Sequence, residues 1–109
     1  MVNRRFVWAD ESLQNAQRIR KFIRSKFTEK EVLAFDKLLL EFERVILRFP
    51  DLYPRSILYP ELHQAVLSKR LTVFYRVDDE DITVLFMKDN RQGYPYHQTD
   101  KADPGDKEK

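Results

Sequence analysis

The side chains best suited to chemistry are cations and titratable rings gathered in the last third of the chain. They are Lys69, Arg70, Arg76, Lys88 and Arg91, followed by Tyr94, Tyr96 and His97. Cations held in place stabilise a negative charge that develops in a transition state, and a neighbouring tyrosine or histidine can transfer a proton. A histidine in such a position is more often solvated than catalytic, so His97 alone indicates no active site.

Composition excludes several other classes of site. The chain has no cysteine and only two histidines, His63 and His97. It therefore lacks thiolate nucleophiles, disulfides and cysteine-ligated zinc, and we expect no metal site. Two glycines among 109 residues leave no glycine-rich phosphate loop, and we expect no cofactor. With 35% charged residues and no long apolar run, the chain is expected to be cytoplasmic and to avoid membranes.

The last cations must be positioned by a β-hairpin. Residues 71–77 and 82–88 are rich in β-branched and aromatic types, and the acidic residues 78–81 separate them. So short a connection predicts antiparallel neighbours, with the four carboxylates at an exposed tip. Because side chains alternate along a strand, Arg76 should lie with Phe74 on the open face of the sheet if Tyr75 faces the core.

Two helices are predicted before this hairpin, over residues 11–26 and 29–48. Asp10 is the expected N-cap of the first helix. Thr28 and Glu31 have the spacing of a capping box, in which each side chain satisfies a free backbone N–H group at the start of a helix. The second helix should end before Pro50, which disfavours helical geometry in the residue that precedes it.

Strands are also expected at residues 4–8 and 62–67, with at most one short strand, over 56–59, in the proline-rich connector between. The length predicts one domain. The predicted fold class is α+β in the order β-α-α-β-β-β. In this fold a helical hairpin packs on a small, mainly antiparallel sheet.

The helices carry more apolar residues than one buried face requires. The expected core faces comprise Leu13, Ala16, Ile19, Ile23 and Phe27 in the first helix, and Val32, Phe35, Leu39, Phe42, Ile46 and Phe49 in the second. Leu33, Leu40 and Leu47 form a further row, seven residues apart, which Asp36 and Glu43 separate from the core stripe. Either the first strand or a loop covers this leucine row, or the row binds an amphipathic or extended segment of a partner.

Charge is unevenly distributed along the chain. Residues 1–27 carry seven cations and two carboxylates, a net +5, so the remaining residues carry −3 of the total +2. The basic face of the first helix includes Arg18 and Arg24. It is either a solvated surface or a contact for an acidic protein or a nucleic acid.

The last half of the chain resembles a known family. The resemblance is carried by residues 65–69 (AVLSK), 73–77 (VFYRV), a short acidic turn, 82–86 (ITVLF) and 89–92 (DNRQ). This pattern is similar to the RelE/ParE superfamily of toxins from type II toxin–antitoxin systems, in the branch that ends the last strand in Asp-Asn-Arg-Gln. With the two helices, the resemblance spans residues 4–92. It implies a RelE/ParE-like domain over 1–98, and the charged residues 99–109 are expected to be a disordered tail.

The resemblance also implies which residues would cleave RNA. The family's basic residue after the last strand falls on Arg91, but three other basic positions fall near Gln64, Val66 and Thr72, which carry no charge. The remaining catalytic candidates are Arg91, Arg76, Arg70 and Tyr94. Asp89 and Asn90 have a structural alternative, since such a pair commonly closes a turn at the end of a strand.

These departures guide the functional expectation. The chain is expected to be the toxin component of a type II toxin–antitoxin pair, or a descendant of one, of the plasmid-stabilization kind. A small cognate antitoxin would bind it at Leu33, Leu40, Leu47, Arg18 and Arg24. DNA gyrase and the ribosome with its mRNA are possible targets that the resemblance implies. The alternatives are a metal-independent endoribonuclease acting on mRNA and a nontoxic protein-interaction module of the same fold.

Overall fold

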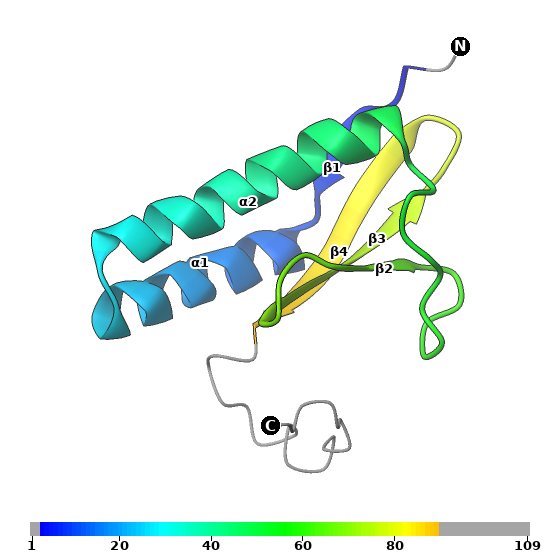
Figure 1. Cartoon of the computed structure of the whole chain (residues 1–109). Helices are drawn as coiled ribbons and strands as arrows, with labels where there is room; N and C mark the ends of the chain where they lie inside the picture. The colour runs from blue at the N-terminus through cyan, green and yellow to red at the C-terminus, as the bar shows by residue number, and fades with distance from the viewer. Residues whose placement is uncertain (1–2, 90–109) are drawn as a thin grey trace.

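The computed structural model describes residues 3–89, which form two helices and one four-stranded sheet (Figure 1). The elements are β1 (Arg5–Trp8), α1 (Asp10–Lys26), α2 (Glu29–Arg48), β2 (His63–Val66), β3 (Leu71–Val77) and β4 (Asp81–Asp89). This arrangement confirms the predicted α+β class and element order. Arg91, Tyr94 and the expected tail over 99–109 lie outside the described residues.

The sheet has the strand order β1-β4-β3-β2. β2, β3 and β4 pair antiparallel, whereas β1 lies parallel to β4, with Trp8 beside Val84. The sheet is therefore mixed but mainly antiparallel, as predicted. A bulge between Phe74 and Tyr75 shifts the register of β3 on β4. β1 and β2 are the two edges of the sheet.

The two helices run side by side and cover one face of the sheet (Figure 1). The core between the layers contains Ile19, Ile23, Val32, Phe35, Leu39, Phe42 and Ile46 from the helices, and Leu71, Val73, Tyr75, Ile82, Val84 and Met87 from the strands. The buried stripes on α1 and α2 follow the expected helical period. Among residues 3–89, neither helix is long and apolar enough to cross a membrane.

Several local expectations were wrong. Asp10 is the first residue of α1 and Ala9 is its N-cap, where the Ser12 hydroxyl donates a hydrogen bond to the Ala9 carbonyl oxygen. Phe27 and Phe49 are exposed, because each is the C-cap of its helix and has left helical geometry. The capping box of Thr28 and Glu31 is present, as predicted.

One further expectation needs correction. Leu13 is 49% exposed, since its position on α1 is turned away from the arc that Ile19 and Ile23 bury. The connector was expected to hold at most one short strand, and over residues 56–59 the structure has none; Arg55 makes a single bridge to His63. The connector after α2 is otherwise irregular, and β2 starts only at His63.

Candidate partner-binding groove

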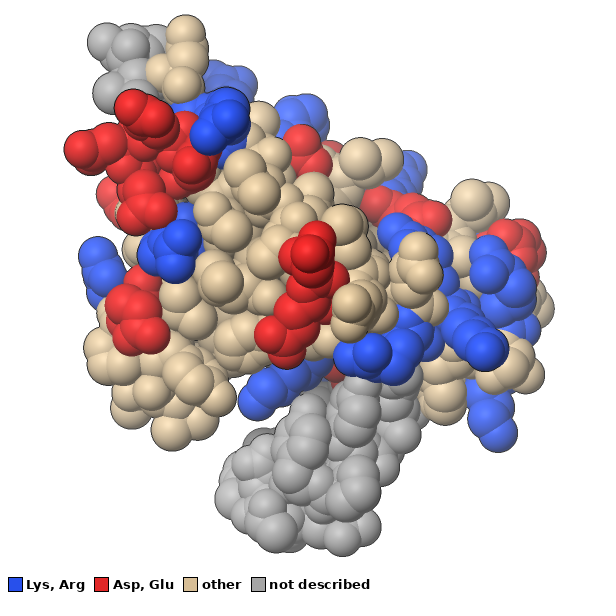
Figure 2. All heavy atoms as spheres, turned by 180° about the vertical axis from the view of Figure 1, so that it is seen from behind, with Lys and Arg blue, Asp and Glu red and all other residues tan. Residues whose placement is uncertain are grey.

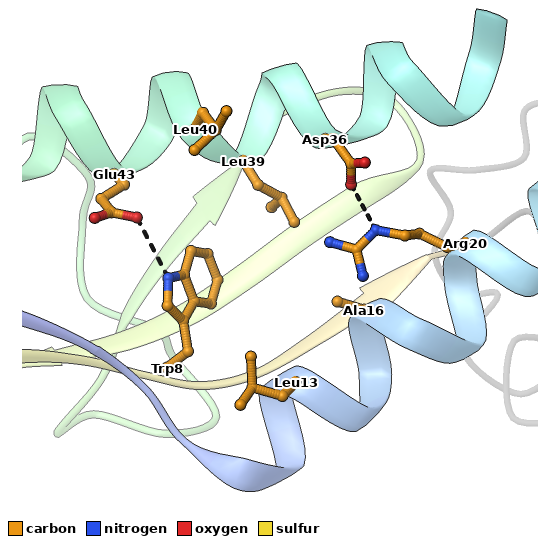
Figure 3. Close-up of a pocket in the computed structure, with 8 residues that line it drawn as sticks. All are labelled: Trp8, Leu13, Ala16, Arg20, Asp36, Leu39, Leu40 and Glu43. Atoms are coloured by element: carbon orange, nitrogen blue, oxygen red, sulfur yellow. Dashed lines mark hydrogen bonds and ion pairs between the residues drawn. The ribbon is translucent and has the colours of Figure 1, made fainter. Parts of the chain in front are cut away.

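A groove of about 340 Å³ lies between α1 and α2, with one end closed by β1 (Figure 3). Its lining residues are Trp8, Leu13, Ala16, Arg20, Asp36, Leu39, Leu40 and Glu43. Apolar side chains form most of this surface, and the charged groups belong to pairs that bridge the groove. Such a mixture suits a segment that buries apolar side chains and aligns a few polar groups.

Two polar contacts connect the walls of the groove (Figure 3). The Arg20 Nε–H donates to Asp36 Oδ1 at 2.6 Å, and the Trp8 indole Nε1–H donates to Glu43 Oε1 at 3.3 Å. The two acceptors, Asp36 and Glu43, are the carboxylates that separate the leucine row from the core stripe. Because each has a donor on a different element, they fasten α2 to α1 and to β1.

The leucine row lies in solvent beside this groove. Leu33, Leu40 and Leu47 are 63%, 67% and 41% exposed, and Leu40 lines the groove itself. Neither β1 nor the connector covers them, so the covering alternative is wrong for the described residues. The core stripe of α2 is complete without the row. These three leucines are therefore exposed in the part of the chain that the structure describes.

The two arginines predicted to bind the partner together with the leucine row lie in different surroundings. Arg24 forms an ion pair with Glu29 at 3.3 Å, and the hydrogen bond from that pair raises the pKa of Arg24. Arg18 lies in a separate polar hollow with Gln14, Gln17 and Lys21, on the face of α1 turned away from the core. The structure thus groups Leu40 with Trp8 and Leu13 and places Arg18 in a different hollow.

Charges of opposite sign gather at opposite ends of the molecule. Figure 2 shows Lys and Arg around the end where α1 meets α2, and Asp and Glu around the β3–β4 turn. Residues 17–37 contain seven cations against three carboxylates. Residues 78–81 are all acidic and are partly neutralised by pairs of Arg5 with Asp81 and Arg76 with Asp78. An acidic partner would thus meet a favourable potential at the helical end.

The open face of the sheet carries an aromatic cluster. The sequence predicts catalytic candidates such as Arg76 on this face. The rings of Phe74 and Phe86 stack with their centroids 4.6 Å apart. Tyr59 reaches over from the connector and meets both rings edge-on, at 5.7 and 5.5 Å. Lys88 Nζ lies 5.6 Å from the Phe74 ring centroid. The connector therefore covers part of the open face of the sheet.

The catalytic candidates are not brought together in the described residues. Arg76 lies on the open face, as predicted, but its Nε–H donates to Asp78 at 3.0 Å. Arg70 is exposed in the β2–β3 turn. Gln64 on β2 and Thr72 on β3 are uncharged, and both are partly buried. Gln64 pairs with Phe74, and Thr72 pairs with Lys88. No cluster of potential metal ligands occurs among residues 3–89.

Sequence reasoning missed two contributions. Trp8 was recognised only as part of a strand, and the pattern of a short edge strand does not reveal which helix its indole will meet. Tyr59 was assigned to a connector, and an aromatic residue in a loop carries no local sign of the ring it will contact. Both contacts depend on pairings between distant parts of the chain.

No protein-family model matches the sequence, and no curated protein sequence matches it. Among solved structures, the toxin chain of the chromosomal ParDE toxin–antitoxin system from P. aeruginosa superimposes with a TM-score of 0.69 at 12% identity, covering 80% of this chain and 96% of that one. YafQ from E. coli strain BL21(DE3) gives a TM-score of 0.48 at 12% identity, covering 84% and 98%. The first similarity shows that this chain has the fold of ParE-type toxins.

Proposed function

We propose that this chain is the toxin component, or a toxin-derived member, of a type II toxin–antitoxin pair. In this proposal a small antitoxin neutralises it in the cytoplasm by laying an amphipathic segment along the leucine row and the groove. The observation that carries the proposal is the set of three exposed leucines on α2 beside a preformed apolar groove. The ParE-type fold supports it.

Energetics support a partner for this surface. Burying a leucine side chain contributes roughly 1.5–3 kcal/mol, whereas an exposed leucine contributes almost nothing. Because the core stripe of α2 is complete without Leu33, Leu40 and Leu47, folding alone does not account for the row. Contiguous exposed apolar surface of this kind usually marks an interaction site.

The groove also defines the chemistry of the segment that would fill it. Leu13, Leu39 and Leu40 require apolar side chains spaced three and four residues apart, as on one face of a helix. The carboxylates of Asp36 and Glu43 already have donors in Arg20 and Trp8, so a partner needs no buried cation to satisfy them. The cations toward the α1–α2 turn favour acidic residues at one end of that segment.

The test is coexpression of the tagged full chain with each adjacent small reading frame. We expect one product to copurify with the wild type, and Leu40→Asp to abolish copurification, because an aspartate would be buried without a partner. The melting temperature of the Leu40→Asp protein should stay close to that of the wild type, since Leu40 is 67% exposed.

Leu52→Asp is the matched control. Leu52 is 54% exposed on the connector, outside the lining of the groove, so this substitution should leave copurification intact. If no adjacent product copurifies with the chain, the toxin–antitoxin proposal loses its support. If Leu40→Asp melts far below the wild type, Leu40 belongs to the core instead.

A further inference from the structure

The connector after α2 is held by hydrogen bonds to the sheet and by hydrogen bonds within itself. The Tyr75 hydroxyl donates to the Pro50 carbonyl oxygen at 2.8 Å, and His63 Nδ1–H donates to the Tyr53 carbonyl oxygen at 2.7 Å. The later bonds run from Gln64 N–H to Pro54 O (2.9 Å), from Ser56 N–H to Leu62 O (2.8 Å) and from Tyr59 N–H to Ser56 Oγ (3.0 Å). This part of the chain is therefore held in one conformation.

The anchored connector presents two aliphatic side chains to solvent. Ile57 is 95% exposed and Leu58 is 76% exposed, although Ser56 immediately before them is buried and Tyr59 immediately after packs on Phe74. A rigid tip loses little conformational entropy when it binds, so apolar side chains on it are well placed for recognition. We call Ile57 and Leu58 the connector tip.

The neighbouring edge of β2 is open at one residue. In an antiparallel pair the main-chain groups of successive residues point alternately toward and away from the neighbouring strand. Leu67 N–H bonds inward to Leu71 O, whereas Gln64 N–H bonds outward to Pro54 O. By this alternation Val66, two residues after Gln64, also directs its N–H and C=O outward, and the connector residues that cover Gln64 do not extend along the strand to it.

A shallow groove adjoins both features. Its lining is Pro54, Arg55, Ile57, Leu58, Gln64 and Val66, with a volume of about 440 Å³, and Val66 is 57% exposed. The protruding tip and the hollow thus belong to one patch. A patch that contains both is complementary to itself when two copies meet about a two-fold axis.

We propose that this patch binds a second copy of the chain. The two β2 edges meet antiparallel at Val66, where equivalent residues exchange a reciprocal pair of N–H···O=C bonds, and each connector tip enters the groove of the other copy. A two-fold pair at Val66 needs only this one outward-facing residue from each copy, whereas a longer strand from a different protein would meet the connector beside Gln64. β2 and β1 are opposite edges of the sheet, so this interface is independent of the groove beside Trp8.

The test is sedimentation velocity of the purified full chain, without antitoxin, from low micromolar to several hundred micromolar. We expect the wild type to shift from monomer to dimer as concentration rises. The double substitution Ile57→Glu/Leu58→Glu should weaken dimerisation by roughly 100-fold or more, because it places charges in an apolar contact. Circular dichroism should show unchanged folding, since neither side chain is buried.

Two further variants make the result specific. Val66→Pro removes the outward N–H but no bond to β3, and an edge strand tolerates proline at such a position, so this variant should fold and dimerise less. Leu33→Glu alters another exposed apolar residue, on α2, and should dimerise like the wild type. A wild type that stays monomeric throughout overturns the proposal, as does a dimer that survives Ile57→Glu/Leu58→Glu or is lost in Leu33→Glu.

Discussion

Tyr75 links three parts of the molecule through one side chain. Its hydroxyl donates to the Pro50 carbonyl oxygen, its ring stacks on His63 with centroids 4.9 Å apart, and Phe42 of α2 meets it edge-on at 5.5 Å. The sheet, the connector and the second helix therefore share a contact. Because the connector carries both Tyr59 and the connector tip, the position of those residues depends on this tyrosine.

Burial raises the pKa of Tyr75 to about 12. A tyrosine in an unfolded chain ionises near ~10, so folding favours the neutral phenol. The stability that this provides is complete below about pH 10 and is lost as pH rises through about 12. We expect a titration of tyrosinate absorbance to show one late-ionising group that disappears in Tyr75→Phe. A titration in which Tyr75→Phe removes an early-ionising group instead would contradict the buried hydroxyl.

At the scale of elements, α2 performs two tasks with two different faces. The stripe from Val32 to Ile46 builds the core, and the leucine row faces solvent beside the groove. The two faces of the β3–β4 hairpin also make different contacts. Its inner face packs on the helices, while Phe74 and Phe86 stack on the outer face beneath Tyr59.

The outer face supports a prediction about RNA. Gln64, Val66 and Thr72 stand near positions where the resemblance implies cations, and none of the three is charged. In comparable chemistry, loss of a single stabilising donor lowers the rate by ~10²–10³. We therefore expect no ribosome-dependent mRNA cleavage, or cleavage at a greatly reduced rate, after induced expression. Mapping of transcript ends is the measurement, with Arg91→Ala as the control. Cuts at ribosomal A-site codons that vanish in Arg91→Ala would contradict it.

The sequence predicted these elements well where local pattern determines them. Helical periodicity, the Thr28 capping box and the β-branched runs gave both helices and the last two strands nearly to the residue. The failures are of another kind. Phe49 has the spacing of a core residue but follows the last helical turn, and spacing alone cannot show where helical geometry stops. Whether the leucine row is covered depends on chain segments far away in sequence, which no helical pattern records.

The candidate site was predictable only where a local pattern determines it. The leucine row was identified from its seven-residue spacing, and its exposure follows from the path of β1 past the carboxylate of Glu43 rather than over Leu40. The strand order, the parallel pairing of β1 and the placement of Tyr59 over Phe74 have no local signal. These long-range contacts determine which residues line the groove, and they determine that Tyr59 covers part of the open face of the sheet.

At the scale of the whole molecule, the first strand completes both the sheet and the groove. Phe6 packs edge-on against Phe42 with centroids 6.1 Å apart and lies 5.3 Å from Trp8. Val7, between them in sequence, points away and is 36% exposed. The attachment of β1 to the layers therefore depends on the two aromatic side chains.

We expect Phe6→Ala to lower the free energy of unfolding by about 2 kcal/mol, because it removes a half-buried ring that joins β1 to α2. Val7→Ala, the neighbouring control, should lower the free energy of unfolding by less than about 1 kcal/mol, since it removes less buried apolar surface. Urea denaturation followed by circular dichroism measures both. Equal losses for the two variants would show that β1 is held by its backbone pairing alone.

The parallel pairing of β1 with β4 has a consequence for synthesis of the protein. Trp8 aligns with Val84, 76 positions later, so β1 is made long before the only strand that it pairs with among the described residues. Other parts of a nascent domain begin to organise from the N-terminus onward. The helical hairpin can form early, but its groove lacks the Trp8 wall until translation reaches β4. A partner that contacts Trp8 therefore recognises only a chain in which β4 has already been made.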